Sequence, residues 1–345
     1  MCRKVFTALA LVFLLTSCSA KSRLVIYTWS DMFPPEILSE YEKETRIKIK
    51  YVNFDENETM MAKLQAARGG KYDLIIADDY MVENVINEGL AQQIDRTQLS
   101  RFQNINPLYQ GQFYDPSDEY SIPYGAGVQT IVYDPQKIDI VIRGYHDLWD
   151  PALEQRIGII GNFRVINGMA LKTLWQSYNT NSLQMITEAG EQLKKLAPNI
   201  RLIRDDKLED ELIAGEIYAA VMYTDQATTA KIERPDLKVV YPFEGVGFGI
   251  MAAFIPVNAP NSDAAHSFLN FILDPERGAR CFEYIRYYST FSASDSFINE
   301  EYRSFLTMSD DFQKNEMEMI QNINPDAEAL HEKIFIEFKS ATGRR

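Results

Sequence analysis

The chain has 345 residues, which at roughly 100 to 200 residues per domain predicts two domains. Hydrophobic residues make up 46% and charged residues 24%, ordinary values that exclude a disordered chain, a collagen or a bundle of membrane helices. Lys and Arg total 35 against 49 Asp and Glu, and the resulting net charge of −14 disfavours nucleic acid and anionic lipid as partners and favours cations.

The N-terminal segment is typical of an export signal. Two basic residues precede the apolar stretch 5–15, which is too short for a membrane-spanning helix of about 20 residues. The sequence Leu15-Thr16-Ser17-Cys18 resembles the lipobox of bacterial lipoproteins, where the signal is cut before a cysteine that is then acylated. We therefore expect residues 1–17 to be removed and Cys18 to carry lipid such as palmitate. An ordinary signal with a chance cysteine is the alternative.

The remaining cysteine is expected to be structural. Cys2 leaves with the signal and Cys18 would carry lipid, so Cys281 has no partner for a disulfide. A lone thiol is more often a buried packing residue than a nucleophile. Stability must then come from the hydrophobic core.

From Leu24 the pattern alternates strand and helix. Apolar runs and period-two alternation predict strands at residues 24–27, 47–54 and 74–77, and helical spacing predicts helices after Pro34-Pro35 and over residues 58–67. The order β-α-β-α-β implies parallel strands joined by right-handed crossovers. The predicted fold class is therefore α/β.

This topology predicts where a ligand binds. In open parallel sheets the ligand lies beyond the carboxyl ends of the strands. The first strand is followed by Trp29, Ser30 and Asp31, and the third is followed by Asp78 and Tyr80. The alternative for each cluster is structural, because an aspartate can cap the next helix and Trp29 can belong to the core.

A second α/β region follows. Strands are predicted at residues 157–160 and 217–222, and helices over 163–175, 182–196 and 207–214. The second of these strands leads into Tyr223 and Asp225, which we expect on the opposite wall of a cleft. An apolar run at 250–257 and helices at 263–273, 275–287 and 327–339 complete the chain. Two lobes without a flexible linker suggest that the chain crosses between them repeatedly and forms a hinge.

Signatures of catalysis are weak, so we expect no enzyme, no cofactor and no metal. The three histidines His146, His266 and His331 are scattered and lack the spacing of a helical zinc site. The run Gly245 to Gly249 lacks the spacing of a phosphate loop and is interpreted as a hinge or close-packing segment. The pair Asp205-Asp206 is interpreted as solvated surface.

One neighbouring pair of tyrosines leaves an alternative open. Tyr287-Tyr288 resembles the phenolate ligands of ferric-ion-binding proteins built on the same bilobal plan. Iron would also require a histidine or further oxygen ligands close by, which the sequence does not clearly offer.

Several motifs together resemble one family, the polyamine-binding solute receptors of ABC importers, of the spermidine/putrescine (PotD) type. The likeness runs from Leu24 to near the C-terminus. It rests on Tyr27-Thr28-Trp29-Ser30-Asp31-Met32-Phe33-Pro34-Pro35, Asn57-Glu58-Thr59-Met60, Tyr72-Asp73-Leu74, Ser121-Ile122-Pro123-Tyr124 and Phe271-Ile272-Leu273-Asp274-Pro275. With the segment before Cys18, it suggests a lipid-tethered bacterial member, such as one from a spirochaete.

The resemblance implies a two-lobed periplasmic-binding-protein fold of type II that closes on a linear polycation. We expect residues 24–128 with 250–296 in the N-terminal lobe and residues 129–249 with 297–345 in the C-terminal lobe. Some ligand-binding residues are implied by the motifs, and others are proposed because they follow the ends of strands. Together they are Trp29, Ser30, Asp31, Asp78, Tyr80, Asn162, Tyr223, Asp225 and Tyr287.

The chemistry of a polyamine suits such a set. Aromatic faces pack on the methylene chain and attract ammonium groups, each cation-π contact contributing on the order of 0.5 to 2 kcal/mol, while carboxylates pair with the charged ends. The chain departs from the family at two places. Where relatives carry acids before one helix it has Asn162 and Val165, with Arg164 beside them, and where they carry a tryptophan and an aspartate around a later strand it has Gly249 and Met251. Fewer acids would favour a shorter diamine or weaker binding.

The sequence thus predicts an extracytoplasmic, lipid-anchored and monomeric receptor. It would bind putrescine or spermidine, deliver it to an ABC permease in the inner membrane, and touch the membrane through the lipid on Cys18. The alternatives are a receptor of the same fold for ferric iron or an amino acid, and a surface hydrolase with an acid pair.

Overall fold

The computed structural model describes residues 23–204, 207–308 and 317–343. The predicted signal, Cys18 and the pair Asp205-Asp206 lie outside these residues. No helix in the described ranges is long and apolar enough to cross a membrane.

The first part of the chain forms the predicted β-α-β-α-β unit. Its elements are β1 (Arg23–Thr28), α1 (Pro35–Thr45), β2 (Lys48–Asn53), α2 (Asn57–Ala67), β3 (Leu74–Asp78) and α3 (Asp79–Asn87). Strand β1 pairs in parallel with both β2 and β3, which confirms the predicted parallel arrangement.

The later elements complete a mixed sheet with helices on both faces. The strands are β4 (Ser121–Tyr133), β5 (Ile157–Ile159), β6 (Ile200–Ile203), β7 (Ala219–Tyr223), β8 (Lys238–Val240), β9 (Val246–Phe254) and β10 (Met317–Met319). The helices are α4 (Phe163–Thr173), α5 (Leu183–Leu196), α6 (Leu208–Ile213), α7 (Thr224–Glu233), α8 (Ser262–Ile272), α9 (Pro275–Ile285), α10 (Glu300–Leu306) and α12 (Pro325–Ala341). The strand order is β2-β1-β3-β9-β4-β7-β5-β6, with β10 beside β9 and β8 beside β4.

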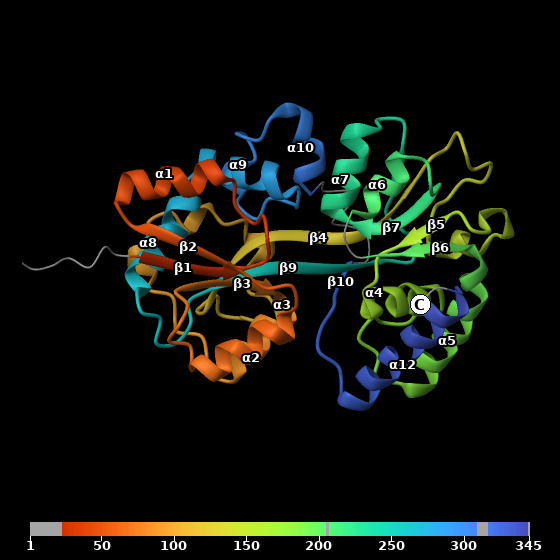
Figure 1. Cartoon of the computed structure of the whole chain (residues 1–345), viewed down its shortest axis with the longest axis horizontal. Helices are drawn as coiled ribbons and strands as arrows, with labels where there is room; N and C mark the ends of the chain where they lie inside the picture. The colour runs from red at the N-terminus through yellow and green to blue at the C-terminus, as the bar shows by residue number, and fades with distance from the viewer. Residues whose placement is uncertain (1–22, 205–206, 309–316, 344–345) are drawn as a thin grey trace, which may run out of the picture.

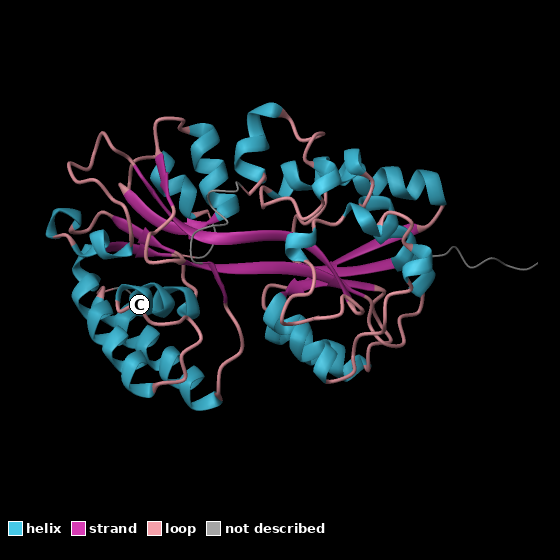
Figure 2. Cartoon of the chain, turned by 180° about the vertical axis from the view of Figure 1, so that it is seen from behind, coloured by secondary structure: helices cyan, strands magenta, loops and turns pink. Residues whose placement is uncertain are grey.

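The two halves of the sheet are joined by its longest strands. In Figure 1, β4 and β9 run across the middle of the molecule, between the half that contains β1 to β3 and the half that contains β5 to β7. The first part of β4 pairs with β9, whereas its second part, Gln129 to Tyr133, pairs with β7. Figure 2 shows the same crossing from behind. Strands of this kind can act as a hinge between the halves.

Alternating side chains place the core on both faces of the sheet. In β1, Leu24 and Ile26 pack in the cluster that includes α1, α8 and α9, while Val25 and Tyr27 pack in the cluster that includes α2 and α3. Strand β7 repeats the pattern with the helices of the other half. Each half therefore has an apolar cluster on each face of its sheet, as the period of two requires.

Two predicted helices end earlier than expected. Helix α4 stops at Thr173, so the prediction that it includes Trp175 was wrong: Trp175 has a left-handed φ of 58° and is 68% exposed. Helix α9 stops at Ile285 because Arg286 adopts a left-handed conformation with φ of 60°. The chain beyond it is extended, and Tyr288 forms a bridge with Ala126 of β4.

The glycine-rich run is part of a strand. Gly247 and Gly249 lie in β9, and a Cβ atom at Gly247 would come within 2.2 Å of the Gln129 side chain on β4. This confirms the close-packing interpretation. The lobe limits stay a prediction: β4 and β9 contribute to both halves, and α10 packs through Leu306 on Ala279 of α9.

Candidate functional site

The candidate site is built where three strands end. Strands β1 and β3 lead into Trp29 and Asp78 from the N-terminal half, and β7 leads into Tyr223 from the C-terminal half. All three side chains are half-buried. The ring of Trp29 packs against Phe54 with 4.4 Å between ring centroids, and its carbonyl oxygen accepts a hydrogen bond of 3.1 Å from the Tyr51 hydroxyl.

The turn after β3 directs neighbouring aspartates to different partners. Asp78 Oδ2 accepts a hydrogen bond from Asn57 Nδ2 at 2.8 Å, and the same nitrogen lies 2.9 Å from the Tyr80 hydroxyl. Burial raises the pKa of Asp78, opposed by the Asn57 bond, and Glu58 raises it further. Asn57 therefore fixes an acid and a phenol side by side.

Asp79 has a structural role in the same turn. Its Oδ2 accepts a hydrogen bond of 3.0 Å from the backbone nitrogen of Ile250 in β9, and its Oδ1 accepts one of 2.8 Å from Tyr80. Burial, which outweighs these bonds, raises the pKa of Asp79 to about 8. The residue ties the start of α3 to β9.

On the other wall, Asp225 carries an unsatisfied oxygen. Burial is the main cause that raises its pKa to about 6; the Gln226 backbone and the Tyr287 side chain oppose the shift, and the charge of Glu209 adds to it. Among the described residues, Asp225 Oδ1 and Glu209 Oε2 are shielded from water and have no hydrogen-bond partner. Burial raises the pKa of Glu209, and Arg204 and Arg286 oppose this rise. Asp225 is the carboxylate that a cationic ligand would suit best, because an unpaired buried charge is costly.

Tyr287 links the two walls. Burial raises its pKa, and the charge of Asp225, then Tyr223 and the charge of Asp78 raise it further. These groups therefore act on one phenol from both halves. The structure brings together Asp78, Tyr80, Tyr223, Asp225 and Tyr287, with Trp29 on the β1 side.

Three predicted residues lie differently. Ser30 and Asp31 are exposed, and Asp31, with a left-handed φ of 55°, acts electrostatically on Tyr51 and Tyr284 rather than on Tyr287. Asn162 is exposed and caps α4, because its Oδ1 accepts hydrogen bonds from the backbone nitrogens of Arg164 and Val165. Their roles in ligand binding stay predictions.

Neighbouring tyrosines 287 and 288 have separate surroundings. The hydroxyl of Tyr288 lies 3.1 Å from that of Tyr241, and its backbone pairs with Ala126, whereas Tyr287 lies among Asp225, Tyr223 and Asp78. The adjacency in sequence therefore does not produce a pair of phenolates aimed at one point. Within the described residues no group of three or more His, Cys, Asp or Glu side chains could hold a metal ion.

A cavity of about 530 Å³ lies beside the site but contains none of its candidate residues. Its lining includes Thr224, which follows Tyr223, and Tyr288, which follows Tyr287. The Thr224 hydroxyl is bonded to the backbone of Val128. The Thr224 hydroxyl and the Tyr287 ring both lie against the Cβ position of Gly127, so the cavity adjoins the site at this point of β4.

The structure also shows residues that the sequence interpretation missed. Asn57 and Glu58 belong to a motif quoted above, but nothing in the pattern connected them with Asp78 and Tyr80. No sequence motif singled out Glu209, and the packing of α6 on α7 is what places its charge near Asp225. Arg164 stood beside the missing acids, and its contacts could not be inferred from the sequence.

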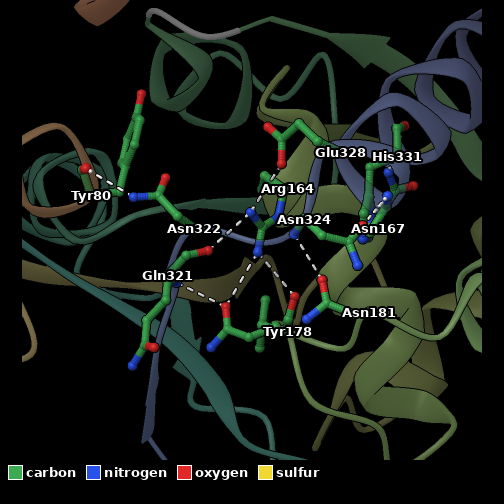
Figure 3. A network of polar contacts seen from close by, with 12 residues as sticks. Tyr80, Arg164, Asn167, Tyr178, Asn181, Gln321, Asn322, Asn324, Glu328 and His331 are labelled. Carbon is green, nitrogen blue, oxygen red and sulfur yellow. Dashed lines mark hydrogen bonds and ion pairs between the residues drawn. The ribbon is translucent and has the colours of Figure 1, made fainter. Parts of the chain in front are cut away.

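Arg164 fastens a distant segment to the C-terminal half, as Figure 3 shows. Its guanidinium donates to the carbonyl oxygens of Gln321 and Tyr178, both at 3.1 Å, and pairs with Glu328 at 3.4 Å. The side chain is 11% exposed. This buried positive charge interacts electrostatically with Glu328 of α12, Glu318 of β10 and, in the other half, Tyr80.

Comparisons with known proteins agree with this picture. The model of a family described as bacterial extracellular solute-binding protein matches residues 36–317. The spermidine/putrescine-binding periplasmic protein of Salmonella typhimurium is 32% identical over 334 residues, which cover 96% of each chain. The putrescine-binding periplasmic protein PotF of Escherichia coli is 28% identical and is matched over 84% of this chain and 83% of its own.

A solved structure supports the fold. The spermidine/putrescine ABC transporter substrate-binding protein PotD from Streptococcus pneumoniae has a TM-score of 0.84 and 28% sequence identity, with 93% of this chain and 99% of that chain covered. The likeness confirms the predicted α/β binding-protein fold.

Proposed function

The chain belongs to the family of bacterial extracellular solute-binding proteins, and we propose that this member captures a linear polyamine, putrescine or spermidine, and delivers it to an ABC permease. The observation that supports the proposal is the position of Tyr287, whose ring packs against Gly127 of β4 and whose phenol is acted on by Asp225 and Tyr223 from one half and by Asp78 from the other. The names of the three relatives reported above all mention putrescine, which supports the same ligand class.

The proposed binding mode follows from the charges of the site. An ammonium group placed between Asp225 and Glu209 would supply the partner that their buried oxygens need. The rings of Trp29, Tyr80, Tyr223 and Tyr287 would pack on the methylene chain. Asp78 would take the other end of the ligand from the N-terminal half, with Asp31 nearer the rim. The activity proposed is binding without catalysis.

Calorimetric titration of the protein lacking residues 1–22 tests this proposal. Putrescine and spermidine should bind, whereas ferric citrate and neutral amino acids should not. Asp225→Asn should weaken binding at least tenfold, equivalent to about 1.4 kcal/mol. Asp31→Asn tests whether this exposed acid of the predicted ligand-binding set takes part in binding, and Asp326→Asn on the exposed start of α12 is the control. Absence of heat with either polyamine would refute the ligand class.

We also propose that Cys18 carries lipid that holds the protein at the outer face of the inner membrane, and that the protein is a monomer. Support comes from the sequence before Cys18. The Cys18→Ala variant should leave the membrane fraction and lose acyl chains in mass spectra. Light scattering of the protein lacking residues 1–22 should give the mass of one chain.

A further inference from the structure

The segment between β10 and α12 is fixed to the C-terminal half. The backbone nitrogen of Gln321 donates to Asn179 Oδ1 at 2.8 Å, and that of Asn324 donates to Asn181 Oδ1 at 2.8 Å. Arg164 holds the carbonyl oxygen of Gln321. This stretch must therefore move with α4, α5 and α12 when the halves move.

One side chain of the segment reaches the opposite half. Asn322 Nδ2 lies 2.7 Å from Glu83 Oε2, 3.2 Å from the carbonyl oxygen of Tyr80 and 3.2 Å from Asn84 Oδ1. All three acceptors are on α3, in the N-terminal half. Figure 3 shows Asn322 extending from the segment toward Tyr80, away from Arg164.

The bond from Asn322 ends on a residue of the candidate site. Tyr80 contributes its ring and hydroxyl to the wall near Asp78, and its carbonyl oxygen receives the Asn322 amide. Because the donor belongs to one half and the acceptors to the other, these bonds exist only while the halves are close together. Hydrogen bonds to a charged acceptor such as Glu83 are stronger than those between neutral groups.

We propose that Asn322 is a positioning residue, which clasps Tyr80 and α3 from the opposite half and thereby stabilises the closed form that retains the ligand. We name the bonds from Asn322 to Tyr80, Glu83 and Asn84 the Asn322 clasp. The inference rests on the proposed function insofar as the retained ligand is a polyamine. It adds a determinant of ligand release that does not itself touch the ligand.

Rate measurements with putrescine and spermidine test the clasp. Asn322→Ala should speed ligand dissociation roughly five- to thirtyfold, as expected for loss of bonds to a charged acceptor, and should leave the association rate nearly unchanged, since the open form receives the ligand. The control is Gln184→Ala, which removes an amide-to-carboxylate bond of 3.1 Å within a single helix, to Glu188. Its rates should equal those of the wild type.

Introducing opposite charges at Asn322 and Glu83 distinguishes a direct contact between the halves from a merely structural role of Asn322. Asn322→Asp places a carboxylate against Glu83 and should speed dissociation more than Asn322→Ala does. Adding Glu83→Lys to Asn322→Asp restores an attractive pair across the halves, so the double variant should dissociate more slowly than Asn322→Asp alone. Equal dissociation rates in the wild type and Asn322→Ala, or no recovery in the double variant, would overturn the proposal.

Hydrogen exchange separates the clasp from the ligand assignment. The free protein samples the closed form as well as the open one, and loss of the clasp lowers the closed fraction. With no ligand added, backbone amides of residues 80–84 should therefore exchange faster in Asn322→Ala than in Gln184→Ala. If the wild type binds neither polyamine, the proposed function is refuted. The comparison of exchange rates still tests the Asn322 clasp in that case, because it needs no ligand. Unchanged exchange in Asn322→Ala would refute the clasp even if polyamines bind.

Discussion

Tyr287 lies so close to Gly127 that a Cβ atom at Gly127 would come within 2.8 Å of Tyr287 Cδ1. Glycine at this position of β4 is therefore what allows the tyrosine ring to lie between the two walls of the site. The contact connects a strand that joins the halves to the residue on which Asp225 and Asp78 act.

Gly127→Ala should displace the Tyr287 ring and weaken polyamine binding about tenfold or more, while lowering the free energy of unfolding by about 1 to 3 kcal/mol through overpacking. Titration calorimetry and urea unfolding measure the two effects. Gly70→Ala is the control, because a Cβ atom there would meet nothing closer than 3.5 Å. Equal affinities in Gly127→Ala and the wild type would show that Tyr287 is not a wall of the site.

The affinity for polyamine should fall below pH 6. The pKa of Asp225 is raised to about 6 before the ligand arrives, and a bound ammonium group would lower it, so protons compete with the ligand. Binding should be roughly tenfold weaker at pH 5 than at pH 7.5. Asp225→Asn should bind weakly at both pH values and lose most of this dependence. If the affinity of Asp225→Asn depended on pH as steeply as that of the wild type, the competing proton would bind to a group other than Asp225.

His331 should make the fold sensitive to acid. It is fully buried, neither ring nitrogen has a hydrogen-bond partner among the described residues, and burial, aided by Arg164, lowers its pKa to about 4. The unfolded chain then binds a proton that the folded chain does not, so stability falls as pH drops from about 6.5 toward 4, by up to about 1.4 kcal/mol per pH unit.

The variant His331→Leu should flatten this part of the stability curve, measured as urea midpoints between pH 4 and 7. The control is His266→Gln, because His266 is also buried but both its nitrogens are hydrogen-bonded, to Asp95 and Ser262. If both variants keep the slope of the wild type, His331 is not the origin of the acid sensitivity.

Cys281 should be inert in the folded protein. Its side chain is fully buried, and burial raises the pKa of the thiol to about 12, which leaves almost no thiolate at neutral pH. In a protein that begins at Ser19, where Cys281 is the only cysteine, a chromogenic disulfide reagent should react only after urea is added. Ser340→Cys, at an exposed position, provides the reactive comparison. Fast reaction of the native wild-type thiol would contradict this prediction.

The elements that the sequence predicted share one property, which is a regular pattern in a single segment. The apolar runs of β1 and β3, the alternation in β2 and the spacing of apolar residues in α1 and α2 determine local structure directly. Strand β4 was missed because Pro123, Gly125 and Gly127 argue against a strand interior. It tolerates them through a register shift between Pro123 and Ala126.

The site was only partly predictable for a physical reason. Parallel topology placed Asp78 and Tyr80 at a strand end, but the direction of a side chain beyond the strand depends on individual dihedral angles. Asp31 follows β1 in a left-handed conformation and is exposed. The relation of Glu209 to Asp225, like the reach of Asn322 to α3, arises from tertiary packing that no local pattern records.

The position of β9 constrains the order in which the molecule can fold. The strand inserts between β3 and β4, yet it is made from residues 246–254, after the whole of β5 to β8. An emerging polypeptide that has not yet supplied Val246 leaves β3 with an unpaired edge, and contacts so distant along the sequence form slowly. The sheet of the N-terminal half therefore cannot be completed until the residues of β9 have been synthesised.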